Sequence, residues 1–199
     1  MSIILDDTTA ALAVRLRHER EQRGWTLADL AARSGVSRAM LSKIEREEAS
    51  PTAALLGRLS GAFGLTMSQL FARPEVQPGS LLTRAADQPL WRDPDTGFTR
   101  RSLSPQGSMQ EGNAALELVW GELPPGAEIA YTMASYAIIK DQQLVVISGQ
   151  LAIRRDATSH ILDPGDCLRW GPPMDTVFHN PGAARCRYVI ALLRGTQSG

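Results

Sequence analysis

Proline divides this chain into two parts with different periodicity. Residues 12–71 contain a single proline, Pro51, whereas the chain from residue 74 onward contains eleven. In the first part apolar residues recur at intervals of three and four, the period of an amphipathic helix. In the second part short apolar or β-branched runs are separated by Pro-Gly and Ser-Gly turns roughly every eight to twelve residues, which favours an antiparallel sandwich or barrel. We therefore expect a helical part followed by an all-β part.

The boundary between these parts is expected in a proline-rich segment. Residues 73–79 read Arg-Pro-Glu-Val-Gln-Pro-Gly, which is the chemistry of a linker. A length of 199 residues suits two small domains. We predict a helical domain over residues 1–73, a linker over 74–79 and a β domain over 80–199. The clearest strand-like runs in the β domain are residues 116–120, 144–147, 151–153 and 187–190.

The two parts of the chain differ in net charge. The whole chain has 21 basic and 21 acidic residues, which argues against a protein that coats a polyanion with its entire surface. Residues 1–73 carry ten basic and eight acidic residues, so their net charge is +2, while the remainder has eleven and thirteen. Residues 11–46 alone hold eight basic and four acidic residues, so a local basic excess lies on the helical stretch.

Cysteine content and the N-terminus indicate the compartment. Cys167 and Cys186 are the only cysteines, too few for a disulfide framework or a zinc-finger spacing. We expect both to be small buried side chains in a reducing compartment. No cationic stretch followed by a long apolar run opens the chain, and no window approaches the roughly 20 apolar residues of a membrane helix. A soluble cytoplasmic protein without a membrane partner is expected.

Residues 26–47 carry the signals of two short helices joined by a tight turn. Thr26 and Asp29 are spaced as a capping box, which opens the first helix. Gly35 supplies the left-handed conformation that the turn requires, and Ser37 is the expected N-cap of the second helix. Ala31 is small enough for a close helix crossing. This spacing predicts a helix-turn-helix, in which the second helix enters the major groove of DNA. The expected core residues are Leu30, Val36, Leu41 and Ile44.

Residues 12–71 resemble the XRE family of phage-repressor-type helix-turn-helix domains. The resemblance rests on residues 24–31 (Gly-Trp-Thr-Leu-Ala-Asp-Leu-Ala) and 36–46 (Val-Ser-Arg-Ala-Met-Leu-Ser-Lys-Ile-Glu-Arg). It implies an all-α, lambda-repressor-like domain of five helices. They would span residues 10–23, 27–33, 38–47, 52–63 and 67–71.

The second helix of the motif supplies the expected DNA contacts. Arg38 is expected either to bind a guanine edge or to hold a phosphate, and its sequence context leaves both open. Lys43 and Arg46 are expected to contact phosphate and set the register. Many family members have glutamine at the position of Leu27, and leucine cannot make that amide contact. Any phosphate there would depend on Thr26 and the helix N-terminus. The full expected set is Thr26, Ser37, Arg38, Ala39, Met40, Ser42, Lys43 and Arg46.

Other charged residues of the helical part are given structural roles. The arginines of the first helix are expected to form a solvated face with pairs such as Glu19–Arg23, in preference to contacting DNA. Glu45 is expected to tie two helices together through an ion pair, in preference to reading a base.

The β part resembles a cupin, a small double-stranded β-helix barrel. Residues 144–151 and 164–168 are similar to the two cupin motifs, and the whole chain resembles bacterial regulators that join an XRE domain to a cupin. Cupin metal sites usually take two histidines and a glutamate from the first motif and a histidine from the second. Here the corresponding positions hold Thr132, Ala134, Gln142 and Thr176, which are poor metal ligands. We therefore expect no metal and no other cofactor.

The barrel is expected to dimerise the chain and to bind a small molecule in its mouth. An arginine reaching into such a pocket would favour a carboxylate. The expected function is a DNA-binding transcriptional regulator, by default a repressor and not an enzyme, that binds a palindromic operator as a homodimer. The alternatives are a metal-dependent cupin enzyme with an appended DNA-binding module, and a structural or antitoxin-like DNA-binding dimer without an effector. The candidate pocket residues are Trp120, Tyr131, Thr132, Gln142, Arg169 and Thr176.

Overall fold

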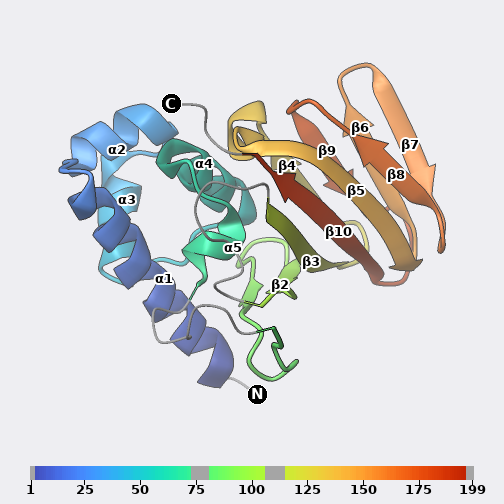
Figure 1. The fold of residues 1–199 in the computed structure, drawn as a ribbon, viewed down its shortest axis with the longest axis horizontal. Coiled ribbons are helices and arrows are strands. Elements are labelled where there is room, and N and C mark those ends of the chain that lie inside the picture. Colours follow the sequence, from blue (N-terminus) through green and yellow to red (C-terminus); the bar gives the residue numbers. More distant parts are fainter. Residues whose placement is uncertain (1–2, 73–80, 106–114, 196–199) are drawn as a thin grey trace.

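A computed structural model describes residues 3–72, 81–105 and 115–195. Helices occupy one side of the molecule and strands the other, with the last two helices between them (Figure 1). The predicted linker at residues 74–79 lies outside the described residues, so the predicted domain boundaries remain a prediction. No helix in the described ranges is long and apolar enough to cross a membrane.

The helical part contains the five expected helices, with changes at their ends. The first helix begins at residue 3 instead of residue 10. The third helix ends at residue 45 instead of residue 47, because Glu47 adopts a left-handed conformation with φ of 63°. The helices are α1 (Ile3–Gln22), α2 (Leu27–Ser34), α3 (Arg38–Glu45), α4 (Ala53–Phe63) and α5 (Met67–Leu70).

The caps predicted from sequence are present. Thr26 and Asp29 form a reciprocal capping box at the start of α2, and the Ser37 side chain accepts a hydrogen bond from the Met40 amide. Gly35 ends α2 with φ of 67°. These local interactions define the two helices and their turn before any packing is considered.

The strands form two antiparallel sheets. A six-stranded sheet has the order β1-β2-β3-β10-β5-β8, and a four-stranded sheet has the order β4-β9-β6-β7. From β3 to β10 the chain passes back and forth between the sheets, apart from the β6–β7 hairpin within the four-stranded sheet. This is the jelly-roll arrangement, the double-stranded β-helix expected for a cupin. The strands are β1 (Leu90–Arg92), β2 (Thr99–Ser102), β3 (Ala115–Leu123), β4 (Glu128–Tyr131), β5 (Ile139–Ser148), β6 (Leu151–Arg155), β7 (Thr158–Leu162), β8 (Cys167–Trp170), β9 (Thr176–His179) and β10 (Cys186–Arg194), with a short 3-10 helix η1 (Met133–Tyr136) after β4.

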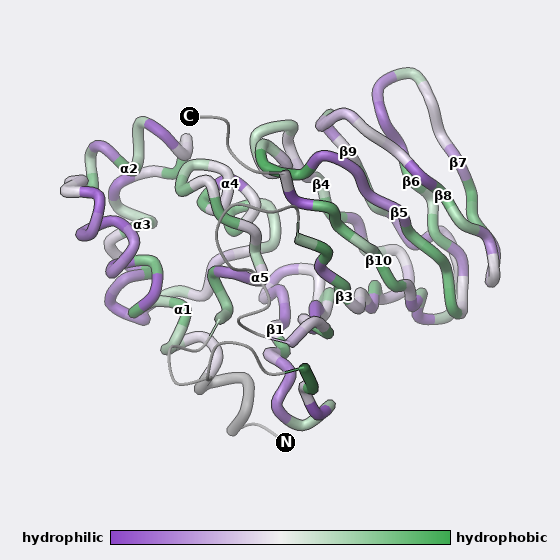
Figure 2. Tube along the Cα trace, in the orientation of Figure 1, coloured by the Kyte–Doolittle hydropathy of each residue, from purple (hydrophilic) through white to green (hydrophobic). Residues whose placement is uncertain are grey.

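Alternation along the strands fills the space between the sheets. In β3 every second residue is buried, including Val119 and Leu123, and Tyr188 and Ile190 in β10 face the same interior. Figure 2 shows hydrophobic stretches along β5 and β10, whereas the region of α2 and α3 is more hydrophilic. Of the two cysteines, Cys186 is buried as expected, and burial raises the pKa of its thiol to about 11. Cys167 is exposed, so that part of the expectation was wrong.

The helical and β parts are packed directly against each other. The rings of Phe71 and Trp91 lie 5.9 Å apart, and the hydroxyl of Thr66 at the start of α5 donates a hydrogen bond of 2.8 Å to Glu117 on β3. The carboxylate of Asp93, just after β1, accepts a hydrogen bond of 2.5 Å from the Ala53 amide at the N-terminus of α4. A side chain from the β part therefore satisfies the start of a helix in the other part.

Candidate nucleic-acid interface and barrel cavity

The recognition helix α3 presents a polar face to solvent. Ser37, Arg38, Ala39 and Lys43 are exposed, while Leu41 and Ile44 are buried in the core. Within the described ranges, no ion pair or hydrogen bond ties the side chain of Arg38 or Lys43 to another residue. Both cations are therefore available to a polyanion.

Three other residues predicted to contact DNA are paired or partly buried within the protein. Arg46 is exposed but forms an ion pair of 2.8 Å with Glu48, which raises the pKa of its guanidinium. Met40 is only partly exposed and packs against the hydrophobic core. Ser42 is half-buried. The exposed cations of α3 without an ion pair to a described residue are therefore Arg38 and Lys43. Arg46 could contact DNA only after breaking its ion pair with Glu48.

Thr26 is used mainly as a helix cap. Its hydroxyl accepts from the Asp29 amide and also lies 2.7 Å from the Asp29 carboxylate, to which its own amide donates. These hydrogen bonds lower the pKa of Asp29, which keeps a negative charge at the start of α2. That charge opposes a phosphate at this helix end. Leu27 packs against the core, in keeping with its lack of a hydrogen-bonding group.

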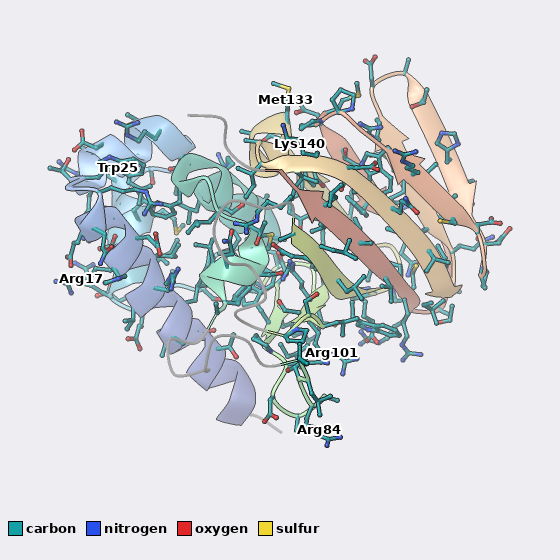
Figure 3. All side chains as sticks on the ribbon, in the orientation of Figure 1. Arg17, Trp25, Arg84, Arg101, Met133 and Lys140 are labelled. Carbon is teal, nitrogen blue, oxygen red and sulfur yellow. The ribbon has the colours of Figure 1, made fainter. Side chains whose placement is uncertain are left out.

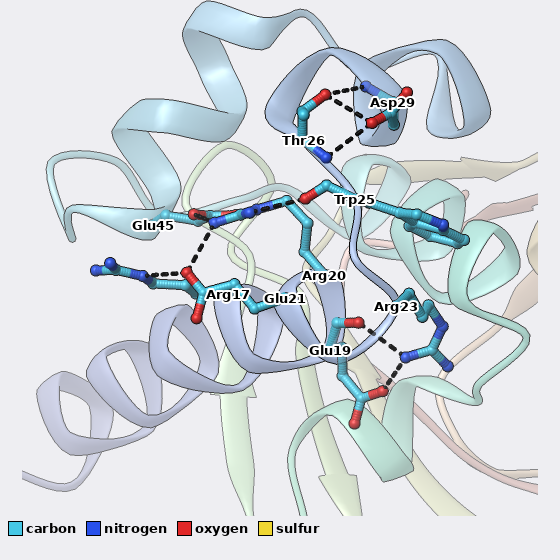
Figure 4. A network of polar contacts seen from close by, with 9 residues as sticks. All are labelled: Arg17, Glu19, Arg20, Glu21, Arg23, Trp25, Thr26, Asp29 and Glu45. Atoms are coloured by element: carbon cyan, nitrogen blue, oxygen red, sulfur yellow. Dashed lines mark hydrogen bonds and ion pairs between the residues drawn. The ribbon is translucent and has the colours of Figure 1, made fainter.

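An ion-pair clamp fixes the orientation of α3. Arg20 on α1 donates hydrogen bonds of 2.7 and 2.8 Å to the two carboxylate oxygens of Glu45 at the end of α3, and a third of 3.0 Å to the Trp25 carbonyl (Figure 4). The side chains are 12% and 9% exposed, so water screens the pair weakly. The expected helix-tying role of Glu45 is present in this geometry, and the pair raises the pKa of Arg20.

The remaining arginines of the first helix are paired as expected. Arg23 binds Glu19, and Arg17 lies 2.9 Å from Glu21 (Figure 4). The ring of Trp25 stacks on Phe63 at 5.8 Å, and the guanidinium of Arg33 lies 4.4 Å from the Trp25 ring centre. These basic residues therefore make contacts within the helical part.

A cavity of about 70 Å³ lies where the barrel meets α5. Of the six predicted pocket residues, only Tyr131 lines it. Arg169, expected as a carboxylate anchor, is exposed and pairs with Asp141 at 2.9 Å. Trp120 lies on the opposite face of β3 from Val119, with the guanidinium of Arg101 5.6 Å from its ring centre. The cationic group on the cavity wall is Arg100, which sequence reasoning missed.

The other three predicted pocket residues lie elsewhere. Gln142 is buried at 3% exposure, and its side-chain carbonyl has no hydrogen-bond partner among the described residues. Thr176 is buried and donates to the Met174 carbonyl. Thr132 is exposed at the start of η1. Gln142 and Thr176 thus face the interior but do not line the cavity.

The residues at the usual cupin metal positions do not fit a metal. Neither threonine, the alanine nor the amide offers a strong ligand, as the sequence indicated. The parts of the chain that the structure describes contain no group of three or more histidine, cysteine, aspartate or glutamate side chains able to hold a metal ion.

Comparisons with known proteins agree with these two parts. The family HTH_3, described as helix-turn-helix, matches residues 16–70. The chain is 27% identical over 178 residues to the HTH-type transcriptional regulator SutR of Escherichia coli K12, covering 89% of this chain and 92% of that protein. The regulator PuuR of the same organism is 32% identical over 71 residues, which are 36% of this chain and 38% of PuuR.

One solved structure shares the complete fold. A transcriptional regulator of the HTH_3 family from Vibrio cholerae superimposes with a TM-score of 0.74 at 21% identity. The match covers 96% of this chain and 99% of that chain. The combination of five helices and a double-stranded β-helix therefore recurs as a unit in another protein.

Proposed function

Residues 16–70 form a helix-turn-helix domain of the HTH_3 family, and from this premise we propose that the chain is a sequence-specific transcriptional regulator that binds double-stranded DNA through α3. The observation that carries the proposal is the exposed pair Arg38 and Lys43 on a helix whose opposite face is buried and clamped by Arg20. Such a helix can enter the major groove without rearrangement. Repression is the simplest consequence, because a bound protein blocks polymerase without further contacts.

The proposed contacts differ in kind. Arg38, at the first position of α3, is placed to read a guanine edge or to hold phosphate, and Lys43, five residues later, contacts phosphate. Ser37, Ala39 and Ser42 complete the face that meets the groove. Thr26, Met40 and Arg46 contribute less, because their side chains cap a helix, pack in the core or pair with Glu48.

Substitution of the two cations tests this proposal. We expect Arg38→Ala to weaken binding to DNA from the chain's own promoter by about 10- to 100-fold, the range for loss of a bidentate base contact. Lys43→Ala should weaken binding to all sequences alike and reduce the slope of log K against log salt by about one. Fluorescence anisotropy titrations over a salt series measure both effects.

Arg154→Ala is the matched control, because it removes an exposed arginine from β6 that pairs with Glu128. Its affinity should equal that of the unmodified protein. The proposal is wrong if the unmodified protein shows no salt-dependent binding, or if both α3 substitutions behave like the control.

We propose that the chain acts as a homodimer through the outer face of the six-stranded sheet. One recognition helix of eight residues reads few bases, and a dimer places two of them on half-sites about 34–36 Å apart. Leu116 and Leu118 on β3 are 58% and 38% exposed, and Ala191 and Leu193 lie beside them on β10. Ile147 on β5 of the same sheet is 48% exposed. This apolar surface supports a second copy as the occupant.

A charged substitution distinguishes this surface from other exposed apolar residues. Leu116→Glu should shift the protein from dimer to monomer in light scattering coupled to gel filtration, because two carboxylates would face each other across a two-fold axis. Ile161→Glu is the control, since Ile161 is 63% exposed on β7 of the other sheet. If the two variants have the same molecular mass in this measurement, the dimer contact lies elsewhere.

We propose that the barrel binds a small molecule and does not catalyse a reaction. Support comes from the residue types at the usual metal positions and from the apolar cavity next to the helical part. The alternative of a dimer without an effector predicts that no small molecule changes DNA affinity.

A further inference from the structure

The cavity between the barrel and α5 is lined by both parts of the molecule. Thr66 and Met67 at the start of α5 form one wall, and residues of both sheets, such as Tyr131 and Tyr188, form the others. A molecule in this cavity would touch the helical part and the barrel at once. Most of the remaining wall is apolar, as Val119, Ile139, Phe178, Ile190 and Leu192 show.

One charged side chain lies on the cavity wall. Arg100 of β2 is 5% exposed, and its guanidinium donates hydrogen bonds of 3.1 Å to Ser102 and 2.9 Å to Ser68. Both partners are neutral hydroxyls. The carboxylate that interacts with Arg100 is Glu117, which lies beyond 4.0 Å. Glu117 does not line the cavity and accepts a hydrogen bond from Thr66. Burial lowers the pKa of Arg100, as expected for a guanidinium without a close counter-ion.

One buried hydroxyl on the same cavity wall lacks a hydrogen-bond partner in the part of the chain that the structure describes. The hydroxyl of Tyr136 is buried, lines the cavity wall and has no hydrogen-bond partner among the described residues. Tyr131 and Tyr188 bring two more phenol groups to the same wall, with the Tyr131 ring 5.8 Å from Tyr136. Burial raises the pKa of all three phenols, so they keep their protons. An occupant that supplies acceptors and a negative charge would satisfy this set.

We propose that this cavity binds a compact apolar monocarboxylate, whose carboxylate pairs with Arg100 and whose hydrocarbon part lies among the aromatic and aliphatic side chains. The cavity volume limits the size of the ligand. A cavity of about 10–15 Å³ holds one water molecule, and this cavity has about 70 Å³. Branched acids of four to six carbons and benzoate fall in this range. Arg101, the neighbouring residue, faces outside the barrel and stacks on Trp120, so only one of the two adjacent arginines serves the site (Figure 3).

The position of the cavity explains how ligand binding could affect the recognition helix α3, an inference that rests on the proposed function. A Cβ added to Gly57 of α4 would lie 2.6 Å from the Ser135 hydroxyl and 2.9 Å from the Tyr131 ring, so α4 rests directly on residues of the cavity wall. The next residue, Arg58, donates a hydrogen bond of 3.3 Å to the Gly35 carbonyl in the helix-turn-helix turn. Occupancy of the cavity therefore biases α4 and, through it, the position of α3.

Thermal shift with acids and their amides tests the ligand class. We expect 2-methylpropanoate, 3-methylbutanoate or benzoate, at millimolar concentration and constant ionic strength, to raise the melting temperature of the full chain by about 3 °C or more. The corresponding primary amides have nearly the same shape but no charge and should give no shift. Equal shifts with acid and amide would overturn the carboxylate assignment without the use of any variant.

Two variants locate the site. Arg100→Gln removes the charge, and Ile190→Phe fills the cavity, so both should abolish the shift by acids. Each is compared with itself without ligand, so a change in its own stability does not affect the readout. Arg101→Gln, at a half-buried neighbour that does not line the cavity, is the matched control and should retain the shift. Retention of the shift in both Arg100→Gln and Ile190→Phe would place the ligand elsewhere.

The effect on DNA separates the two proposals. An acid that raises the melting temperature should change operator affinity of the unmodified protein by at least about fivefold, and the change should vanish in Arg100→Gln. If DNA binds with salt dependence but no acid shifts the melting temperature or the affinity, the cavity inference fails and the proposed function stands. If DNA does not bind at all, the proposed function fails, while the thermal shift still reports on the cavity.

Discussion

Glu45→Ala is expected to lower the free energy of unfolding by about 3 kcal/mol, the range for breaking a largely buried ion pair by removing one partner. Arg20 would keep its hydrogen bond to the Trp25 carbonyl but lose both bonds to the carboxylate, and its charge would remain largely out of water. The measurement is urea unfolding of the full chain followed by circular dichroism at 222 nm. Because the pair also orients α3, operator affinity should fall as well.

Glu21→Ala is the control for this substitution. Glu21 also contacts Arg20, at 3.3 Å, but its carboxylate is 53% exposed, so its loss should leave the unfolding midpoint almost unchanged. A double substitution of Arg20 and Glu45 by alanine should cost less than the sum of the two single ones, because neither charge is left alone. Strict additivity would show that the two side chains do not act as a pair.

Asp93→Ala is expected to cost about 3 kcal/mol of stability. The buried carboxylate accepts hydrogen bonds from the amides of Ala53, Asp95 and Thr96, and buried amides left without acceptors cost about 1–3 kcal/mol each. The Ala53 amide belongs to the first turn of α4, so the loss would weaken the contact between the helical and β parts. The same urea titration measures the cost, and limited proteolysis should cut the variant faster near this contact.

Two further variants test whether the Asp93 carboxylate is responsible for this stability. Asp93→Asn keeps one acceptor oxygen and should retain part of the stability, whereas Asp95→Ala changes an exposed neighbour whose side chain is not used in this turn. An Asp93→Ala variant as stable as Asp95→Ala would show that water replaces the carboxylate as the helix cap.

Local features of the helical part could be predicted from sequence. The caps Thr26 and Ser37 and the turn at Gly35 depend on residues within a few positions of each other, so composition and spacing suffice. The sequence predicts the end of α3 two residues too late, because Glu47 adopts a left-handed conformation that glutamate rarely adopts.

The cavity could not be predicted in the same way. In a strand, a shift of one residue moves a side chain to the other face, so only the register decides that Arg100 faces the interior and Arg101 does not. The sequence favours Arg169 for this role, but its strand places it beside Asp141 on the surface. The contact between Asp93 and Ala53 joins residues 40 positions apart, which no local pattern contains.

The packing of Trp91 on Phe71 affects how this protein can be divided for experiments. Trp91 is 1% exposed and lies in the chain well after the predicted linker, yet its ring covers an aromatic side chain that directly follows α5. A fragment ending at residue 73 would expose Phe71 to water and leave the start of α4 without Asp93. A transplantable DNA-binding module from this chain should therefore include β1 and the turn that follows it, or carry substitutions that replace both contacts.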